Sequence, residues 1–291
     1  MTHKKLIGAL CLSLAASIWG GMFVVVKSVV TVIPPVELVW LRYLVAMVVL
    51  LVIMRLKGVR WQWDRRNGLL LLVIGLVGNA LSIVTQETGT WLSSAQLGAV
   101  VTAATPAFMV LFSWALLRVR PTRGDWASLV LAMLGVVAIV GLAFKGRRVL
   151  LGALCLLLAA LTWALMSVLV RLVAAQYDAL QVTFVGTVVA WLTLTPWTAT
   201  HWHTLAQVDF SQPHIWLSIL YLGAISTALA FVVWNAGLRL LASNLSGLFF
   251  LFQPIVGAVL GWLFLGEPLT VGFAVGTGMI FLSIWVAVRW R

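Results

Sequence analysis

Four charged side chains lie in or beside the long apolar stretches of this 291-residue chain, namely Lys27, Glu37, Arg42 and Glu87. An ionisable group in hydrocarbon is costly unless it is paired or reached by water, so each of the four is a candidate for function. Two positive and two negative charges favour a partly wet cluster. Such a cluster could hold a gate shut, and it could bind a proton or a substrate carboxylate.

These charges also permit a purely structural interpretation. Lys27 and Glu37 could extend to the membrane surface, which would leave only Arg42 buried. Arg42 lies about six residues inside its apolar stretch, or roughly 9 Å at 1.5 Å per residue. That depth is too great for a lipid-facing side chain to reach water comfortably, but it suits one that faces a cavity. We therefore expect Arg42 in the solute pathway or its gate.

The composition excludes an ordinary soluble domain. Apolar residues make up 63% of the chain and charged residues 9%, against roughly 45–50% and about 25% in soluble domains. The net charge of +12 stems from basic residues between apolar stretches, where they orient helices and meet anionic lipid rather than nucleic acid. Cys11 and Cys155 both lie inside apolar segments, so we expect no disulfide, no metal site and no cofactor.

Ten apolar stretches are each close to the roughly 20 residues that a spanning helix needs. They cover residues 6–28, 36–54, 68–86, 93–117, 124–143, 149–172, 179–197, 214–236, 243–264 and 269–288. With the N-terminus in the cytoplasm, most Lys and Arg residues fall in cytoplasmic connections, as the positive-inside rule requires. The sequence thus predicts an all-α integral membrane protein with ten transmembrane helices and both termini cytoplasmic.

The chain contains two copies of one unit. Residues 8–29 match residues 152–173 at 13 of 22 positions, with a constant offset that pairs Trp19 with Trp163. A weaker echo pairs Pro106 with Pro254. The unit holds five helices, an odd number, so the copies should enter the membrane from opposite sides. Inverted repeats of this kind are typical of carriers that open one central cavity alternately to each side.

Two prolines near the centres of their spans mark a candidate cavity wall. Pro106 and Pro254 each remove a helix hydrogen bond and free a carbonyl, which is tolerated best beside a cavity or a polar neighbour. Thr105 and Gln253 supply that polarity. The alternative is that both prolines are simple kinks.

Further candidates for the pathway are aromatic and neutral polar side chains near mid-membrane depth. Trp19 and Trp163 could line a cavity for apolar or aromatic solutes, or could simply pack between helices. Hydrogen-bonding groups that could face the pathway, or join helices together, are Asn79, Ser82, Tyr221 and Thr227.

Several stretches agree in order and spacing with one known group of transporters. They are Trp19-Gly20-Gly21-Met22-Phe23 with Lys27, then Pro35 and Leu41-Arg42-Tyr43, then Thr105-Pro106, and last Gln253-Pro254 leading to Leu265-Gly266-Glu267-Pro268-Leu269-Thr270. In these stretches the chain resembles the EamA family of the drug/metabolite transporter superfamily. The resemblance covers essentially the whole chain. It implies a bacterial inner-membrane carrier of two repeats, residues 1–146 and 147–291, that exports small metabolites, amino acids or drug-like solutes.

A secondary transporter is therefore the expected function, with a small-molecule substrate and the bilayer as partners. A translocator of lipids or lipid-linked intermediates and a non-catalytic scaffold are the alternatives. A membrane enzyme is disfavoured because the chain has no HExxH, GxSxG or P-loop motif. Without a site for ATP, the energy comes from the solute gradient or an ion. Proton coupling through Glu87 or Glu37 and facilitated diffusion both stay open, as do a monomer and a homodimer.

Overall fold

The structure is a computed structural model that describes residues 3–138, 146–174, 176–240 and 247–289. This part of the chain is helical throughout and contains no strand. The first half comprises α1 (His3–Val29), α2 (Pro35–Leu56), α3 (Arg65–Ile74), η1 (Gly75–Leu81), α4 (Ser82–Leu92), α5 (Ala95–Thr102), α6 (Thr105–Leu117) and α7 (Arg123–Ala138). The second half comprises α8 (Arg147–Val173), α9 (Ala179–Thr200), α10 (Trp202–Ala206), α11 (Pro213–Leu220), η3 (Tyr221–Leu229), α12 (Ala230–Leu240), η4 (Gly247–Leu251), α14 (Phe252–Leu265) and α15 (Val271–Arg289).

In the part of the chain that the structure describes, seven continuous helices are long and apolar enough to cross a membrane, and shorter apolar helices cover Phe249–Leu265 and Val271–Val286. Large apolar side chains such as Val48, Leu69 and Leu263 are exposed on the outer surface of the bundle, as a bilayer-facing protein requires. The expected spans 124–143 and 243–264 run partly outside the described residues, because 139–145 and 241–246 are not among them.

Two expected helix ends are displaced outward. The third span continues to Leu92 instead of ending at residue 86, because the side chain of Glu87 is buried and paired and so does not mark a boundary. The seventh continues to Thr200 with Pro196 inside it. A charge, which serves as a stop signal in a sequence, therefore lies within a span here, whereas Pro196 lies inside its span as the expected bounds of 179–197 already implied.

Four spans are irregular near their middles. Pro106 stands in the first turn of α6, after a break at Ala103 and Ala104, and Pro254 stands near the start of α14, after the short 3₁₀ helix η4. A proline fits the first helical turn because the N–H that it lacks has no partner there. The other two irregular spans contain the π-helical segments η1 and η3, a geometry found frequently at functional sites.

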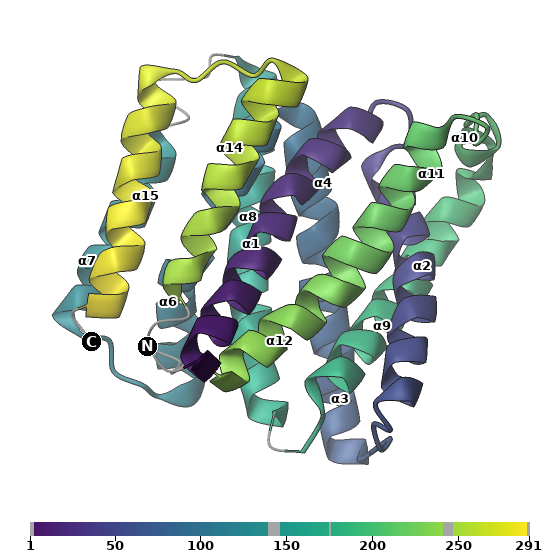
Figure 1. The fold of residues 1–291 in the computed structure, drawn as a ribbon, viewed down its shortest axis with the longest axis horizontal. Coiled ribbons are helices and arrows are strands. Elements are labelled where there is room, and N and C mark those ends of the chain that lie inside the picture. Colours follow the sequence, from purple (N-terminus) through teal and green to yellow (C-terminus); the bar gives the residue numbers. More distant parts are fainter. Residues whose placement is uncertain (1–2, 139–145, 175, 241–246, 290–291) are drawn as a thin grey trace.

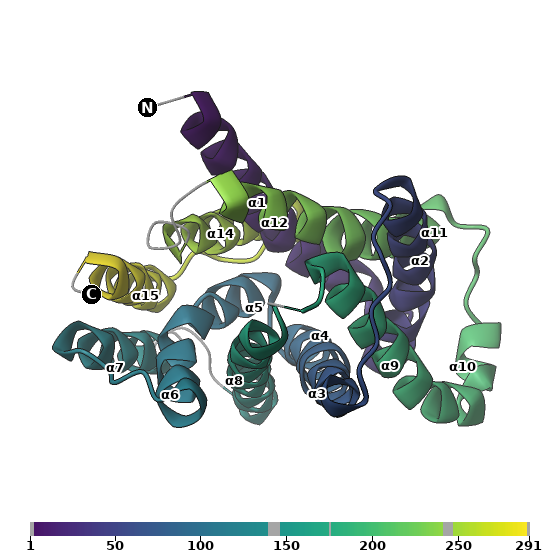
Figure 2. The ribbon, with the colours of Figure 1, turned by 90° about the horizontal axis from the view of Figure 1, so that it is seen from below.

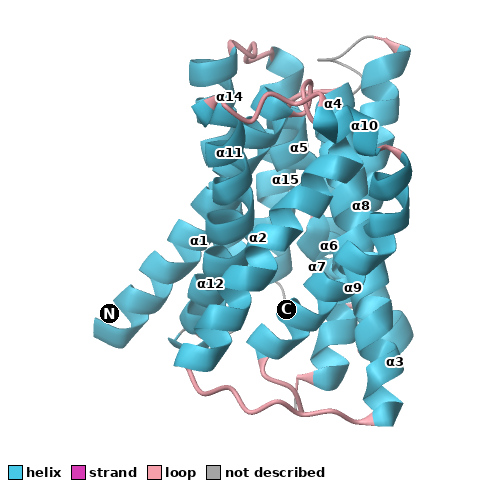
Figure 3. Cartoon of the chain, turned by 90° about the vertical axis from the view of Figure 1, so that its right-hand side faces the viewer, coloured by secondary structure: helices cyan, strands magenta, loops and turns pink. Residues whose placement is uncertain are grey.

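The two halves of the chain interleave rather than form separate bodies (Figure 1). Helix α1 packs against α12 and α14, α8 packs against α4 and α6, α2 packs against α9, and α7 packs against α15. Figure 2 shows these helices in two facing rows, with α15, α14, α1 and α12 in one and α7, α6, α8 and α9 in the other. The start of α1 and the end of α15 lie toward the same end of the bundle (Figure 3).

Glycines permit the closest of these approaches. A Cβ on Gly20 of α1 would lie 2.5 Å from the carbonyl oxygen of Gln253, and a Cβ on Gly257 would lie 2.4 Å from the Cβ of Ala99. Helices α1, α5 and α14 therefore meet with almost no side chain between their backbones, which places Gln253 beside the centre of the bundle.

Candidate functional site

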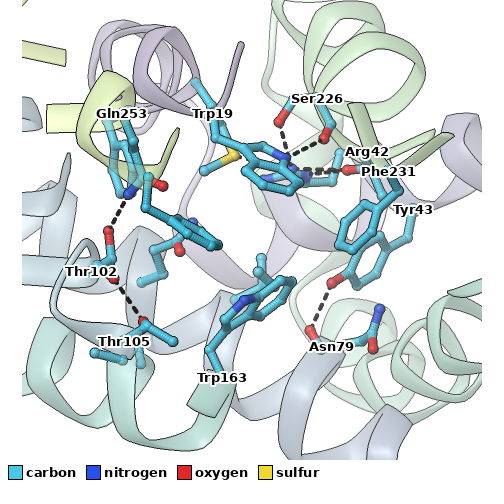
Figure 4. Close-up of a pocket in the computed structure, with 18 residues that line it drawn as sticks. Trp19, Arg42, Tyr43, Asn79, Thr102, Thr105, Trp163, Ser226, Phe231 and Gln253 are labelled. Atoms are coloured by element: carbon cyan, nitrogen blue, oxygen red, sulfur yellow. Dashed lines mark hydrogen bonds between the residues drawn. The ribbon is translucent and has the colours of Figure 1, made fainter. Parts of the chain in front are cut away.

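A cavity of about 60 Å³ lies between the two rows of helices, where the irregular spans meet (Figure 4). Both halves of the chain line it. The lining residues are Trp19, Met22, Phe23, Arg42, Tyr43, Asn79, Ile83, Gln86, Thr102, Thr105, Ala159, Ala160, Trp163, Ser226, Thr227, Phe231, Phe250 and Gln253. Among the residues that the structure describes, Arg42 is the one charged side chain in this lining, and no Asp or Glu belongs to it. The volume suffices for a few ordered water molecules.

Arg42 is held by partners from both halves of the chain. Its Nη1 donates a hydrogen bond to Oε1 of Glu87 on α4 at 2.6 Å, which forms a buried ion pair. Its Nη2 donates to the hydroxyl of Thr227 at 2.9 Å and, at 3.4 Å, to that of Ser226. Both hydroxyls belong to the π-helical segment η3. The guanidinium therefore ties α2 and α4 to η3 at the edge of the cavity.

Two neighbouring side chains on α4 have unsatisfied polar atoms. Glu87 is 0% exposed, and while its Oε1 accepts from Arg42, its Oε2 has no hydrogen-bond partner. The amide nitrogen of Gln86, which lines the cavity, also has no partner. Buried polar groups without partners are rare in proteins and call for an explanation. A solute or water in the cavity could accept the hydrogen bond that Gln86 offers.

Aromatic rings form the apolar wall of the cavity. The indole N–H of Trp19 donates to the carbonyl of Ser226 at 3.1 Å, and its ring stacks on that of Phe250 with centroids 6.2 Å apart. The ring of Trp163 lies 5.9 Å from that of Phe231. Figure 4 shows the rings of Trp19, Trp163 and Phe231 around this space. They provide flat apolar surface next to the guanidinium of Arg42.

Further polar groups of the lining form one short chain of hydrogen bonds and one separate hydrogen bond. The amide of Gln253 donates to the hydroxyl of Thr102 at 2.7 Å, and the hydroxyl of Thr105 donates to the carbonyl of Thr102, also at 2.7 Å. The hydroxyl of Tyr43 donates to the carbonyl of Asn79 at 2.7 Å. These bonds satisfy carbonyls at the interruption between α5 and α6 and within η1.

The expected cluster of four charges is reduced to one pair. The side chain of Lys27, a residue of α1, reaches the carboxyl end of α4. Its ammonium donates hydrogen bonds there to the carbonyls of Thr90, Trp91 and Ser93 at 2.7–3.1 Å. Glu37 is buried in the first turn of α2 and forms no ion pair with Lys27 or Arg42. The physical reason is that the last carbonyls of a helix lack intrahelical partners and attract a cation.

The structure places the other candidates from the sequence in two groups. The candidates that line the cavity are Trp19, Arg42, Asn79, Thr105, Trp163, Thr227 and Gln253. Those outside its lining are Lys27, Ser82, Glu87, Pro106, Tyr221 and Pro254. Of this second group, Ser82 donates to the carbonyl of Ala159 at 2.9 Å and Tyr221 to that of Ile18 at 2.9 Å, so both join helices together.

The lining residues that were not among the candidates from the sequence include Gln86, Phe231 and Phe250. Helical spacing could have found two of them. Gln86 follows Asn79 by seven residues and Phe231 follows Thr227 by four, and residues at such spacings share one face of a helix. Phe250 gives no comparable signal, because it lies in the 3₁₀ helix before α14.

Long apolar helices around a small cavity with polar and aromatic walls define a multi-pass membrane protein. The sequence profile of the EamA-like transporter family matches it twice, over residues 6–141 and 150–289. The chain therefore belongs to the EamA-like transporter family.

Relatives with full-length similarity have transporter names without a stated substrate. An uncharacterized transporter of Archaeoglobus fulgidus is 25% identical over 281 residues, which cover 96% of this chain and 98% of that protein. The uncharacterized transporter YetK of Bacillus subtilis is 26% identical over 294 residues, which cover 98% of this chain and 88% of that protein. A solved crystal structure superimposes with a TM-score of 0.66 at 20% identity and covers 99% of both chains, which shows the shared fold. The family and these names indicate a transporter rather than an enzyme.

Proposed function

We propose that this protein is a secondary transporter that moves a small organic solute through the central cavity by alternating access. The observation that carries the proposal is that one cavity, deep in a membrane protein of a transporter family, is lined by both halves of the chain. A site that both halves share can change its exposure when the halves move relative to each other.

We further propose that the moving parts are two inverted five-helix repeats, residues 1–146 and 147–291, with both termini in the cytoplasm. Three observations support this. The family profile matches each half separately. Helix α1 packs on α12 and α14 of the second half, much as α8 packs on α4 and α6 of the first half. The π-helical segments η1 and η3 occupy comparable places in the two halves. Each half contributes an interrupted helix to the cavity, as transporters with repeats commonly do.

The size of the cavity favours a state in which the pathway is nearly closed. A volume of about 60 Å³ holds a few waters, whereas pockets for drug-sized ligands occupy roughly 300–1,000 Å³. A metabolite or amino acid therefore requires the two rows of helices to separate. Export from the cell, which the family resemblance suggests, is the direction that we propose.

Transport assays with matched tryptophan variants test the proposal. Metabolites that raise the thermal stability of the purified protein would be selected first, because a ligand stabilises the folded state that binds it. Counterflow of the selected solute into proteoliposomes should be saturable. It should fall at least about tenfold in Trp163→Ala, which removes a cavity wall worth roughly 1.5 kcal/mol or more of contact. Trp262→Ala is the matched control, because Trp262 is 56% exposed on the outer surface.

Equal transport by both variants, or no saturable transport of any selected solute, would contradict a solute pathway through the cavity. Movement of fluorescent phospholipid between leaflets, without solute counterflow, would instead support the lipid translocator.

A further inference from the structure

The ion pair of Arg42 and Glu87 is built so that an anion could exchange with the carboxylate. We infer that the solute carries a carboxylate or similar oxyanion, which replaces Glu87 on Arg42 while Glu87 takes up a proton. This inference rests on the proposed function of the cavity. It deepens that function by naming the chemical class of the solute and the ion that is bound together with it.

The charges of the cavity exclude one class of solute and favour another. The wall contains the guanidinium of Arg42 and, among the described residues, no carboxylate. A cationic solute would therefore meet a like charge in the wall, while the carboxylate of Glu87 lies outside the lining. A carboxylate is the natural partner of a guanidinium, which can donate two parallel hydrogen bonds to it. The unpartnered amide nitrogen of Gln86 offers a further donor at the same wall.

Glu87 occupies the place that such a solute anion would take, and only one of its oxygens is bound. Oε1 lies 2.6 Å from Nη1 of Arg42, and Oε2 is buried without a partner. The remaining bonds of Arg42 reach the hydroxyls of Thr227 and Ser226 and the sulfur of Met22. All three acceptors are neutral, and the hydroxyls can turn to other partners. A single strong hydrogen bond thus joins Arg42 to Glu87. A solute carboxylate that accepts two hydrogen bonds competes with Glu87 for the guanidinium of Arg42.

No other described cation stands ready to neutralise Glu87 once Arg42 has turned to the solute. Lys27, from α1, is engaged by the carbonyls at the end of α4. Besides Arg42, α2 contains Glu37 and Tyr43, which are not basic, and Arg55. Arg55 lies in the last turn of α2, about 20 Å of helix rise away from Arg42. The packed segments η1, α5 and residues 149–170 of α8 contain no Asp, Glu, His, Lys or Arg, and η3 contributes only Tyr221.

Glu87 must therefore take up a proton when the anion binds, because a fully buried charge without a partner is more costly than a neutral carboxylic acid. The net charge of the site is zero before and after the exchange. Before it, Arg42 is paired with ionised Glu87, and after it, Arg42 is paired with the solute anion beside neutral Glu87. Anion and proton consequently bind together and cross the membrane in the same direction.

Binding measurements with three matched probes test the inference. The probes are 3-phenylpropionate, its neutral amide 3-phenylpropionamide and the cation 3-phenylpropylammonium, all with the same ring for the aromatic wall. Titration calorimetry on the full-length purified protein, repeated in buffers of different ionisation enthalpy, gives affinity and proton uptake. We expect the carboxylate to bind at least about tenfold tighter than the amide, with about one proton taken up per anion. In the pH range where one full proton is taken up per anion, the affinity for the carboxylate should fall about tenfold for each unit by which the pH rises.

Glu87→Gln keeps Arg42 and the size of the side chain, so it should bind 3-phenylpropionate without proton uptake and with an affinity independent of pH. Glu37→Gln is the matched control, since it removes the other buried carboxylate near these spans, and it should behave as the wild type does. Arg42→Gln should bind the carboxylate and the amide equally, at least about tenfold more weakly than the wild type binds the carboxylate.

Each other outcome has a definite meaning. Equal or tighter binding of the amide or the ammonium to the wild type overturns the anionic solute but leaves the solute cavity intact. Carboxylate binding without proton uptake, or with uptake that Glu87→Gln retains, overturns the exchange. Failure of all three probes to bind the wild type contradicts both this inference and the proposed cavity.

Discussion

At the scale of the residue, the account depends on a guanidinium and a carboxylate buried together in a membrane protein. Arg42 is 3% exposed and Glu87 0% exposed. Removal of one partner from such a pair typically costs about 3–5 kcal/mol, because it leaves an uncompensated charge. The two partners differ, however, in what the survivor can do. A carboxylate can become neutral by taking up a proton, whereas a guanidinium in a protein stays charged.

This difference predicts an unequal pair of single variants. Glu87→Ala should lower the free energy of unfolding by about 3–5 kcal/mol at every pH between 5 and 8. Arg42→Met should be less harmful at pH 5 than at pH 8, because folded Glu87 must then keep a proton that becomes scarcer as the pH rises. Denaturation in mixed micelles at both pH values measures this. A loss in Arg42→Met that does not change with pH would mean that Glu87 lies in water or has another partner.

The sequence grouped Arg42 with three other charges, but it did not identify Glu87 as the one that pairs with Arg42. Arg42 lies about six residues inside its apolar stretch, too deep for a lipid-facing side chain to reach water comfortably. This depth was the reason to expect Arg42 at a cavity. Glu87 stood close enough to the expected end of its span to be taken as a boundary residue. Only the packing of α2 against α4 brings these two side chains together, and a pattern along one chain does not reveal such a pairing. The same limit explains why Lys27 and Glu37 were grouped with them.

At the scale of the element, the irregular helices and the close helix contacts place the cavity. The prolines and the repeat predicted interruptions in the fourth and ninth spans. The π-helical segments η1 and η3 were not predicted, because one extra residue in a helical turn leaves no clear mark in an apolar sequence. These segments contribute Asn79, Ser226 and Thr227 to the polar lining. Asn79 and Thr227 were candidates from the sequence, but the π-helical geometry that positions them was not predicted.

Two charged side chains, Lys27 and Glu267, hold the turn between α4 and α5 from its two sides. From the sequence, Lys27 was expected near the end of the first span and Glu267 in a connection. Lys27 binds the carbonyls that end α4. Glu267, which follows α14, accepts hydrogen bonds from the first amides of α5, those of Ala95 at 2.7 Å and Gln96 at 2.9 Å. Each charge complements the partial charge of the helix end that it touches. One end of the bundle is therefore fastened across both halves of the chain.

The contact between α1 and α14 gives a prediction at this scale. Gly20→Ala should lower the free energy of unfolding by about 1–3 kcal/mol, a typical cost of overpacking, because its Cβ would lie 2.5 Å from the carbonyl oxygen of Gln253. Gly278→Ala is the control, since no atom lies within 4 Å of a Cβ there. The measurement is the thermal stability of both variants in one detergent. Equal stability would show that α1 and α14 are further apart than described.

At the scale of the whole molecule, the all-helical membrane architecture followed from composition and from the length of the apolar stretches. Family membership followed from motifs in a fixed order, and the double match of the family profile agrees with the internal repeat. The interleaving of the halves was not predicted. Self-similarity between residues 8–29 and 152–173 indicates two copies, but it does not say that α1 packs against the second half and α8 against the first.

The proposed inversion of the repeats gives a topological prediction. Alkaline phosphatase and green fluorescent protein fused after residue 144 should report the periplasm, and the same reporters after residue 291 should report the cytoplasm. In the proposed topology an odd number of spans separates the N-terminus from residue 144, and an even number separates it from residue 291. If both fusion points reported the same side, the copies would not be inverted.

The central claim is that the cavity of Arg42 and Trp163 opens to both sides of the membrane in turn, and cysteine accessibility tests it most directly. In a chain with Cys11 and Cys155 replaced by serine, Asn79→Cys places one thiol in the cavity lining. Leu192→Cys, on the lipid-facing surface at 56% exposure, is the control. A membrane-impermeant maleimide should label Asn79→Cys in right-side-out and in inside-out vesicles but leave Leu192→Cys unlabelled in both. Labelling of Asn79→Cys from one side only, or from neither, would contradict alternating access.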